Sequence, residues 1–160
     1  MCAMCDGRTA TDLMAEIYQD IERVGWAVVA VEDDAGRHAY TYTVGLTRYH
    51  GHPELLVSGN DFARAHHVID EIATLVAGGR RLVEGEFLVP EGVGLLCRTI
   101  RVSRPGRLRL ARAVYGGRGF APVSALQVVW VDEHGRWPWE YCEEHAGGHV
   151  LYGPPWPSVG

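Results

Sequence analysis

Lysine is absent from this chain of 160 residues, and all 15 basic residues are arginines. Schiff-base chemistry, a lysine general base and the lysine of a P-loop are therefore excluded. Long apolar runs are also missing, because the longest run near the start, residues 26–31, is far too short to span a bilayer. No basic region followed by an apolar core is present, so we expect no secretory signal and a cytoplasmic location.

The composition is that of an ordinary globular protein. Hydrophobic residues make up 47% of the chain and charged residues 22%, which excludes a disordered or fibrous chain. The sequence contains no internal repeat, no G-x-S-x-G elbow and no Walker loop. We therefore expect a single domain over residues 1–160.

The spacing of apolar residues predicts two main helices. Residues 9–24 carry an apolar stripe at helical spacing, and Thr9 or Thr11 can cap the start of this helix. Residues 61–77 carry a second stripe, with Asn60 as the expected N-cap. Each helix is followed by glycine, which suits a helix C-terminus.

Runs rich in β-formers predict more strands than helices. The first two runs flank a polar turn and predict an antiparallel hairpin. A loop is expected over 47–53 and a short helix over 105–115. Together these features predict an α+β domain with a largely antiparallel, curved sheet of about six strands. The expected strands cover residues 26–32, 38–46, 54–58, 81–89, 94–102 and 124–131.

Charge is distributed unevenly along the chain. The net charge of −5 combines −8 over residues 1–91, +7 over residues 92–131 and −4 over residues 132–160. The total argues against a dedicated nucleic-acid binder, although the positive middle stretch weakens that argument. The middle stretch either pairs with the acidic remainder of the fold or binds an anionic ligand, because arginine matches phosphate and carboxylate bidentately. The candidate ligand-binding residues are Tyr42, Arg98, Arg101, Arg109 and Arg112.

Two short motifs near opposite ends of the sequence supply ligands that zinc prefers. Cys2 and Cys5 form a C-x-x-C, and Cys142 and His145 form a C-x-x-H. Three thiolates and an imidazole fit a tetrahedral zinc site, and four protein ligands indicate a structural rather than a catalytic ion. The alternatives are that His149 replaces His145, that a water opens the site to chemistry, or that the C-x-x-C is an incidental or redox pair.

His50, His52 and Glu54 alternate along the chain. In an extended segment all three would project to one side and give two imidazoles and a carboxylate, the ligand set of facial-triad iron sites. This pattern predicts a catalytic pocket, close to Tyr42, for metal-assisted or acid–base chemistry. The alternative is a polar loop entering a strand, in which Pro53 stiffens the approach and Glu54 caps or forms an ion pair.

Three tryptophans and one cysteine are the remaining residues for which the sequence suggests a role. Trp137, Trp139 and Trp156 form either an aromatic platform for a ligand or a plug at the end of the sheet. Cys97 lies in an apolar run and is expected to be a buried core thiol.

The ordered motifs of the chain resemble a bacterial domain-of-unknown-function family, number 4262. The resemblance implies a small, single-domain, cytoplasmic protein, and it supports a shared role for the two cysteine motifs without implying an activity. The order of segments also looks like flavin-reductase split barrels, although no flavin fingerprint is present. The resembling segments are Met1–Gly7, Gly25–Trp26, Tyr42–Leu46, His52–Leu55, Ala125–Trp130 and Tyr141–His145.

The sequence therefore favours a zinc-containing binding or accessory module for a partner protein or an anionic small molecule. The second hypothesis is an enzyme with a His/Glu pocket around residues 42–54, and the third is a flavin-binding split barrel.

Overall fold

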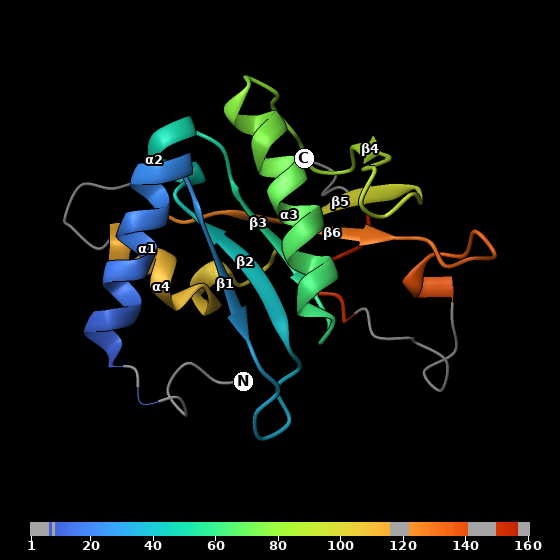
Figure 1. Ribbon diagram of the computed structural model, residues 1–160. Helices are drawn as coiled ribbons and strands as arrows, with labels where there is room; N and C mark the ends of the chain where they lie inside the picture. The colour runs from blue at the N-terminus through green and yellow to red at the C-terminus, as the bar shows by residue number, and fades with distance from the viewer. Residues whose placement is uncertain (1–6, 8, 116–121, 141–149, 157–160) are drawn as a thin grey trace.

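The computed structural model describes residues 7, 9–115, 122–140 and 150–156, and within these ranges the chain forms an α+β fold (Figure 1). The expected fold class is confirmed. The elements in chain order are α1 (Ala10–Val24), β1 (Ala27–Val31), β2 (Tyr40–Val44), α2 (Leu46–His50), β3 (Glu54–Ser58), α3 (Phe62–Ala77), β4 (Phe87–Leu88), β5 (Cys97–Arg101), a 3₁₀ turn η1 (Pro105–Arg107), α4 (Arg109–Tyr115), β6 (Ala125–Trp130) and a 3₁₀ turn η2 (Pro138–Glu140).

The six strands form one open sheet in the order β1-β2-β3-β6-β5-β4. β1 and β2 form the expected antiparallel hairpin. The expectation of an antiparallel sheet holds for every pair except one, because β3 and β6 run parallel with Glu54 opposite Ala125. β3 and β6 are the two central strands and are almost entirely buried, which explains their near-continuous apolar sequences.

The two long helices lie where their apolar stripes predict them. Thr9 and Asp12 form a capping box at the start of α1, and Gly25 ends that helix in the left-handed conformation. Asp61, rather than the expected Asn60, caps α3 by accepting the Arg64 amide at 3.1 Å. The expectation of two main helices is incomplete, because α2 and α4 add two shorter ones. No helix in the described ranges is long and apolar enough to cross a bilayer.

The segment 47–53 was expected to be a loop, and the structure corrects this with the five-residue helix α2. Gly45 precedes α2 with φ of 124°, where a side chain would be strained. A Cβ at Gly45 would also lie 2.9 Å from the Gly25 carbonyl oxygen. Short-range periodicity could not reveal this helix, because the carboxylate of Glu54, which follows the helix in the chain, accepts the Gly45 and Thr47 amides of its first turn.

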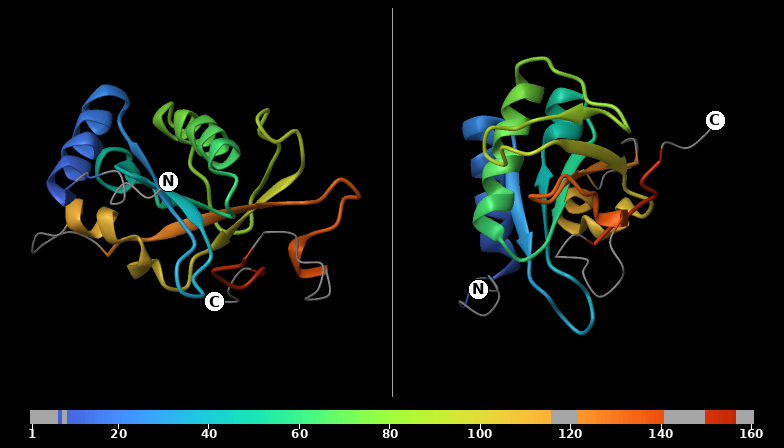
Figure 2. Two further views of the ribbon diagram at one scale, coloured as in Figure 1. Left: turned by 60° about the horizontal axis from the view of Figure 1, so that its bottom comes forward. Right: turned by 90° about the vertical axis from the view of Figure 1, so that its right-hand side faces the viewer.

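The helices cover both faces of the sheet. α3 and α4 lie on opposite sides of it, as the left view of Figure 2 shows. α3 packs over β1, β2 and β3 in one hydrophobic core. α1 and α4 pack in a second core with the other face of β1, β2 and β3.

A C-terminal segment, residues 150–156, lies against the same face as α4. The buried amide of Gln127 in β6 donates to the Val150 carbonyl at 2.7 Å and accepts the Tyr152 amide at 2.8 Å. The Ser103 amide donates to the Tyr152 carbonyl at 2.9 Å. These bonds fix Tyr152 beside β2 and η1, although more than 100 residues separate it in sequence from β2.

Candidate functional site

A cavity of about 410 Å³ lies where the β1–β2 hairpin, the start of α4 and the C-terminal segment meet. Its walls contain three guanidinium groups, two phenol groups and one imidazole. None of the described residues that line it is acidic. We call it the arginine pocket, and it is lined by Gly36, Arg37, His38, Tyr40, Gly106, Arg107, Arg109 and Tyr152.

Local contacts hold the walls of the arginine pocket in place. The Tyr40 hydroxyl donates to the Arg107 carbonyl at 3.1 Å, which ties β2 to η1. The Arg107 guanidinium carbon lies 4.0 Å from the centre of the Tyr152 ring, a cation–π contact. Tyr152 meets Tyr40 edge to face at 5.7 Å. Arg37 is placed by the hairpin turn, in which its amide donates to the Asp34 carbonyl at 2.7 Å.

The three arginines act together on the hydroxyl of Tyr40. Burial raises the pKa of Tyr40, while the charges of Arg107, Arg109 and Arg37 act in the opposite direction. All three cations are therefore close enough to stabilise negative charge at this position. The Arg107 Nε is buried and has no hydrogen-bond partner within the described part of the chain. The pocket can therefore offer positive charge to an anion.

Tyr42, expected to bind ligand, lies behind this pocket and not in its lining. Its side chain is 1% exposed, and its ring stacks on Tyr40 at 5.9 Å. Its hydroxyl accepts the Leu110 amide of α4 at 3.2 Å. Burial raises the pKa of Tyr42 well above the usual range of a tyrosine. Tyr42 thus supports the pocket wall from the core.

The other arginines expected to bind an anion do not share one surface. Arg109 lines the arginine pocket, whereas Arg112 on the same helix is exposed outside its lining. Arg101 borders a second recess, of about 610 Å³, which Pro105 also lines. Arg98 is buried next to aromatic rings at the β4 edge of the sheet. The basic block of the sequence is therefore divided among several places in the fold.

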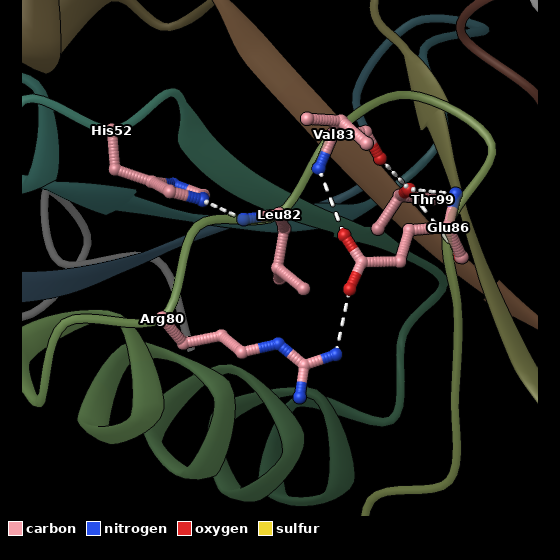
Figure 3. A network of polar contacts seen from close by, with 6 residues as sticks. All are labelled: His52, Arg80, Leu82, Val83, Glu86 and Thr99. Atoms are coloured by element: carbon pink, nitrogen blue, oxygen red, sulfur yellow. Dashed lines mark hydrogen bonds and ion pairs between the residues drawn. The ribbon is translucent and has the colours of Figure 1, made fainter.

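Both ring nitrogens of His52 are engaged in hydrogen bonds to the backbone, and Figure 3 shows the one to Leu82. Its Nε2 accepts the Leu82 amide at 3.0 Å, and its Nδ1 lies 2.7 Å from the Pro53 carbonyl oxygen. Because a carbonyl only accepts, Nδ1 carries the proton and the ring is neutral. Burial lowers the pKa of His52, with the bond to Pro53 acting in the opposite direction. This arrangement leaves no lone pair on the ring for a metal ion.

Figure 3 also shows why the Leu82 amide faces His52. Glu86 accepts from Arg80 at 2.6 Å and from the Val83 amide at 3.1 Å, which folds the segment after α3 back on itself. The Thr99 hydroxyl of β5 donates to the Val83 carbonyl at 2.6 Å and anchors this segment to the sheet.

Glu54 is buried completely at the start of β3. Its carboxylate accepts the Thr43 hydroxyl at 2.5 Å, the Gly45 and Thr47 amides at 3.1 Å each, and the Tyr115 hydroxyl. Burial raises the pKa of Glu54, and these hydrogen bonds act in the opposite direction. The carboxylate therefore joins the first turn of α2 to β2 and α4.

The structure does not bring His50, His52 and Glu54 together. The expected extended conformation is wrong, because His50 ends helix α2. His52 bonds to a residue of the core under α3, whereas Glu54 bonds to Tyr115 in the core under α4. Within the described ranges no three histidine, cysteine or acidic residues are grouped to hold a metal ion.

The expected zinc ligands Cys2, Cys5, Cys142 and His145 lie outside the described residues, so this site stays a prediction. Cys97 is the buried thiol that the sequence predicts. Burial raises the pKa of its thiol to about 12, so Cys97 is protonated and unreactive at neutral pH.

A family model described as a domain of unknown function, DUF4262, matches residues 20–142. The chain belongs to the DUF4262 family. The resemblance found in the motifs is thereby confirmed. No curated protein and no solved structure matches the chain.

The match to DUF4262 covers most of the arginine pocket but ends before Tyr152. Sequence reasoning singled out Arg109 and missed Arg37, Tyr40 and Tyr152. Arg107 belongs to the basic block but was not selected from it. A preference for arginines next to turns, with tyrosine nearby, would have selected both Arg37 and Arg107.

Proposed function

We propose that this DUF4262 chain is a binding domain for an anionic small molecule, which it holds in the arginine pocket. The observation that carries the proposal is the convergence of Arg37, Arg107 and Arg109 on one cavity that has no acidic residue among its described lining. Phosphate and carboxylate groups match guanidinium geometry, and a partly enclosed site strengthens each charge-assisted hydrogen bond.

The pocket also has features of a small-molecule site rather than of a solvated charged surface. Its volume of about 410 Å³ lies in the range of ligand cavities. The rings of Tyr40 and Tyr152 give it an aromatic wall, and the hydroxyl of Tyr152 donates to the His38 carbonyl at 3.3 Å at its edge. We therefore favour a ligand with a planar or apolar part beside its anionic group.

Calorimetric titration with pyrophosphate at neutral pH tests this proposal. We expect binding that weakens at high salt and that falls by tenfold or more in Arg109→Ala, because one charge-assisted contact is lost. Arg104→Ala is the matched control, since Arg104 is exposed and does not line the pocket. Equal losses in the two variants, or no heat of binding in the unmodified protein, would contradict the proposal.

A structural zinc ion held by Cys2, Cys5, Cys142 and His145 remains part of the proposed module. The motif pair in the sequence supports it. A cytoplasmic location fits these thiols, which would stay reduced there. Metal analysis of protein purified without chelator is expected to give about one zinc per chain. Less than a tenth of an equivalent of any transition metal would overturn this part of the proposal.

A further inference from the structure

A ring of aromatic side chains surrounds Arg98 at the β4 edge of the sheet. Phe87 contacts Trp137 with ring centres 6.0 Å apart, Trp137 stacks on Trp139 at 5.0 Å, and Trp139 meets Trp156 at 5.9 Å. Arg98 closes this ring, because its guanidinium carbon lies 5.1 Å from the Phe87 ring centre and 5.2 Å from that of Trp156. These five residues, which we call the aromatic ring site, come from four separate segments of the chain: β4, β5, the region of η2 and the C-terminal segment.

Arg98 is a buried cation without an anionic partner. The residue is 9% exposed, and no carboxylate within the described ranges pairs with it. Its Nε is buried without a hydrogen-bond acceptor in those ranges. Aromatic rings offset part of the cost of burying a guanidinium, but they supply no in-plane acceptors for its N–H groups. Arg98 is therefore left with the donors that bind a carboxylate.

The surroundings of Arg98 are both apolar and accessible. Phe87 is 53% exposed and Trp156 is 61% exposed, so two walls of the site face solvent. Val83 and Val89, which precede and follow β4 in the sequence, are also exposed. The aromatic ring site therefore offers the single charge of Arg98 beneath exposed rings, whereas three arginines line the arginine pocket.

We propose that the aromatic ring site binds an organic carboxylate with an apolar or aromatic body. Arg98 takes the carboxylate through its N–H groups, and the rings of Phe87 and Trp156 contact the body. One guanidinium matches the single charge of a carboxylate, and the tryptophans supply stacking area at low entropic cost. The proposal is independent of the anion bound in the arginine pocket.

Phenylacetate is the probe, and its uncharged counterpart phenylacetamide is the ligand control. The tryptophan indole N–H signals in an NMR spectrum of ¹⁵N-labelled protein report where each compound binds. We expect phenylacetate to shift the signals of Trp137, Trp139 and Trp156 in a saturable manner. Trp26 is the internal reference, because it is buried in the core under α3 and its indole N–H already donates to Asp70 at 3.0 Å. We expect phenylacetamide to bind at least tenfold more weakly.

Two variants separate ligand binding from a purely structural role of Arg98. Arg98→Met keeps the length of the side chain and removes its charge, so the affinity for phenylacetate should fall tenfold or more and become equal to that for phenylacetamide. Trp156→Ala changes an exposed residue and should reduce affinity without loss of folding. Tyr49→Ala is the control, because Tyr49 is another exposed aromatic residue, and it should leave the affinity unchanged.

The proposal would be overturned by several results. Equal affinities for phenylacetate and phenylacetamide in the unmodified protein would show that the charge plays no part in binding. Absence of shifts in the signals of Trp137, Trp139 and Trp156 would show that the ligand does not bind at this site. If Arg98→Met does not fold, Trp156→Ala decides, and unchanged affinity in that variant refutes the proposal. Inorganic phosphate added at saturation should not displace phenylacetate, and displacement would assign the binding to the arginine pocket.

Discussion

Glu54 offers the sharpest test of how the fold is held together. Replacing it by alanine removes the acceptor of four donors, which come from Thr43, Gly45, Thr47 and Tyr115. The Gly45 amide still reaches the Tyr115 hydroxyl at 2.5 Å, so three donors are left without an acceptor: the Thr43 hydroxyl, the Thr47 amide and the Tyr115 hydroxyl. A buried donor without an acceptor costs about 1–3 kcal/mol. We therefore expect Glu54→Ala to lower the free energy of unfolding by about 3–9 kcal/mol.

Glu54→Gln is the matched control, because it keeps the shape and one acceptor oxygen. We expect this variant to cost about 1 kcal/mol or less near neutral pH, since it also removes a charge that is expensive to bury. Urea unfolding followed by tryptophan fluorescence measures both variants, with the m-value expected to stay unchanged. A loss below about 1 kcal/mol for Glu54→Ala, or equal losses in the two variants, would refute the reasoning.

The pH dependence of stability, compared between the unmodified protein and Glu54→Gln, provides a second test of the role of Glu54. Burial raises the pKa of Glu54 in the folded protein, so the unfolded chain releases this proton at a lower pH than the folded chain does. As pH rises above the ordinary glutamate pKa of about 4.3, the unfolded state gains stability first. The unfolding free energy of the unmodified protein should therefore fall relative to that of Glu54→Gln. Parallel pH profiles would contradict this assignment.

Three further predictions concern His52, Gly153 and the cysteines. Because burial lowers the pKa of His52, the unmodified protein should lose stability relative to His52→Gln as pH falls below about 6.5. Thermal unfolding at several pH values measures this difference. Gly153→Ala should weaken pyrophosphate binding, because a Cβ there would lie 1.7 Å from the Arg101 carbonyl oxygen and push Tyr152 out of the arginine pocket. Gly78→Ala is the control, because a Cβ at Gly78 would make only ordinary contacts, and this variant should bind pyrophosphate normally. Cys5→Ser should lose zinc and thermal stability together, and unchanged zinc content would exclude Cys5 as a ligand.

The sequence correctly predicts the helices and strands that are stabilised by contacts between residues close together in the chain. The capping box of Thr9 and Asp12 and the left-handed Gly25 are short-range features, and α1 lies between them as expected. The β1–β2 hairpin likewise follows from two adjacent β-rich runs around one turn. Helix α2 was missed because Glu54, several residues further along the chain, satisfies the amides of its first turn.

Long-range contacts set the features that the sequence did not predict. The parallel pairing of β3 with β6 joins residues about 70 positions apart, and no local pattern encodes it. The arginine pocket combines Arg37 from a hairpin, Arg107 and Arg109 from the η1–α4 segment, and Tyr152 from the C-terminal segment. The alternation of His50, His52 and Glu54 was misleading, since it assumed an extended backbone throughout, whereas His50 ends helix α2 and Gly51 is left-handed.

The most direct test of the anion-binding account is to locate an oxyanion in the protein. Crystals of the full chain grown without phosphate or sulfate and soaked in tungstate would show the bound ion by its anomalous scattering. The account predicts the strongest peak between the guanidinium groups of Arg37, Arg107 and Arg109, and its loss in Arg109→Ala. A strongest peak elsewhere, or a peak that persists unchanged in Arg109→Ala, would contradict it.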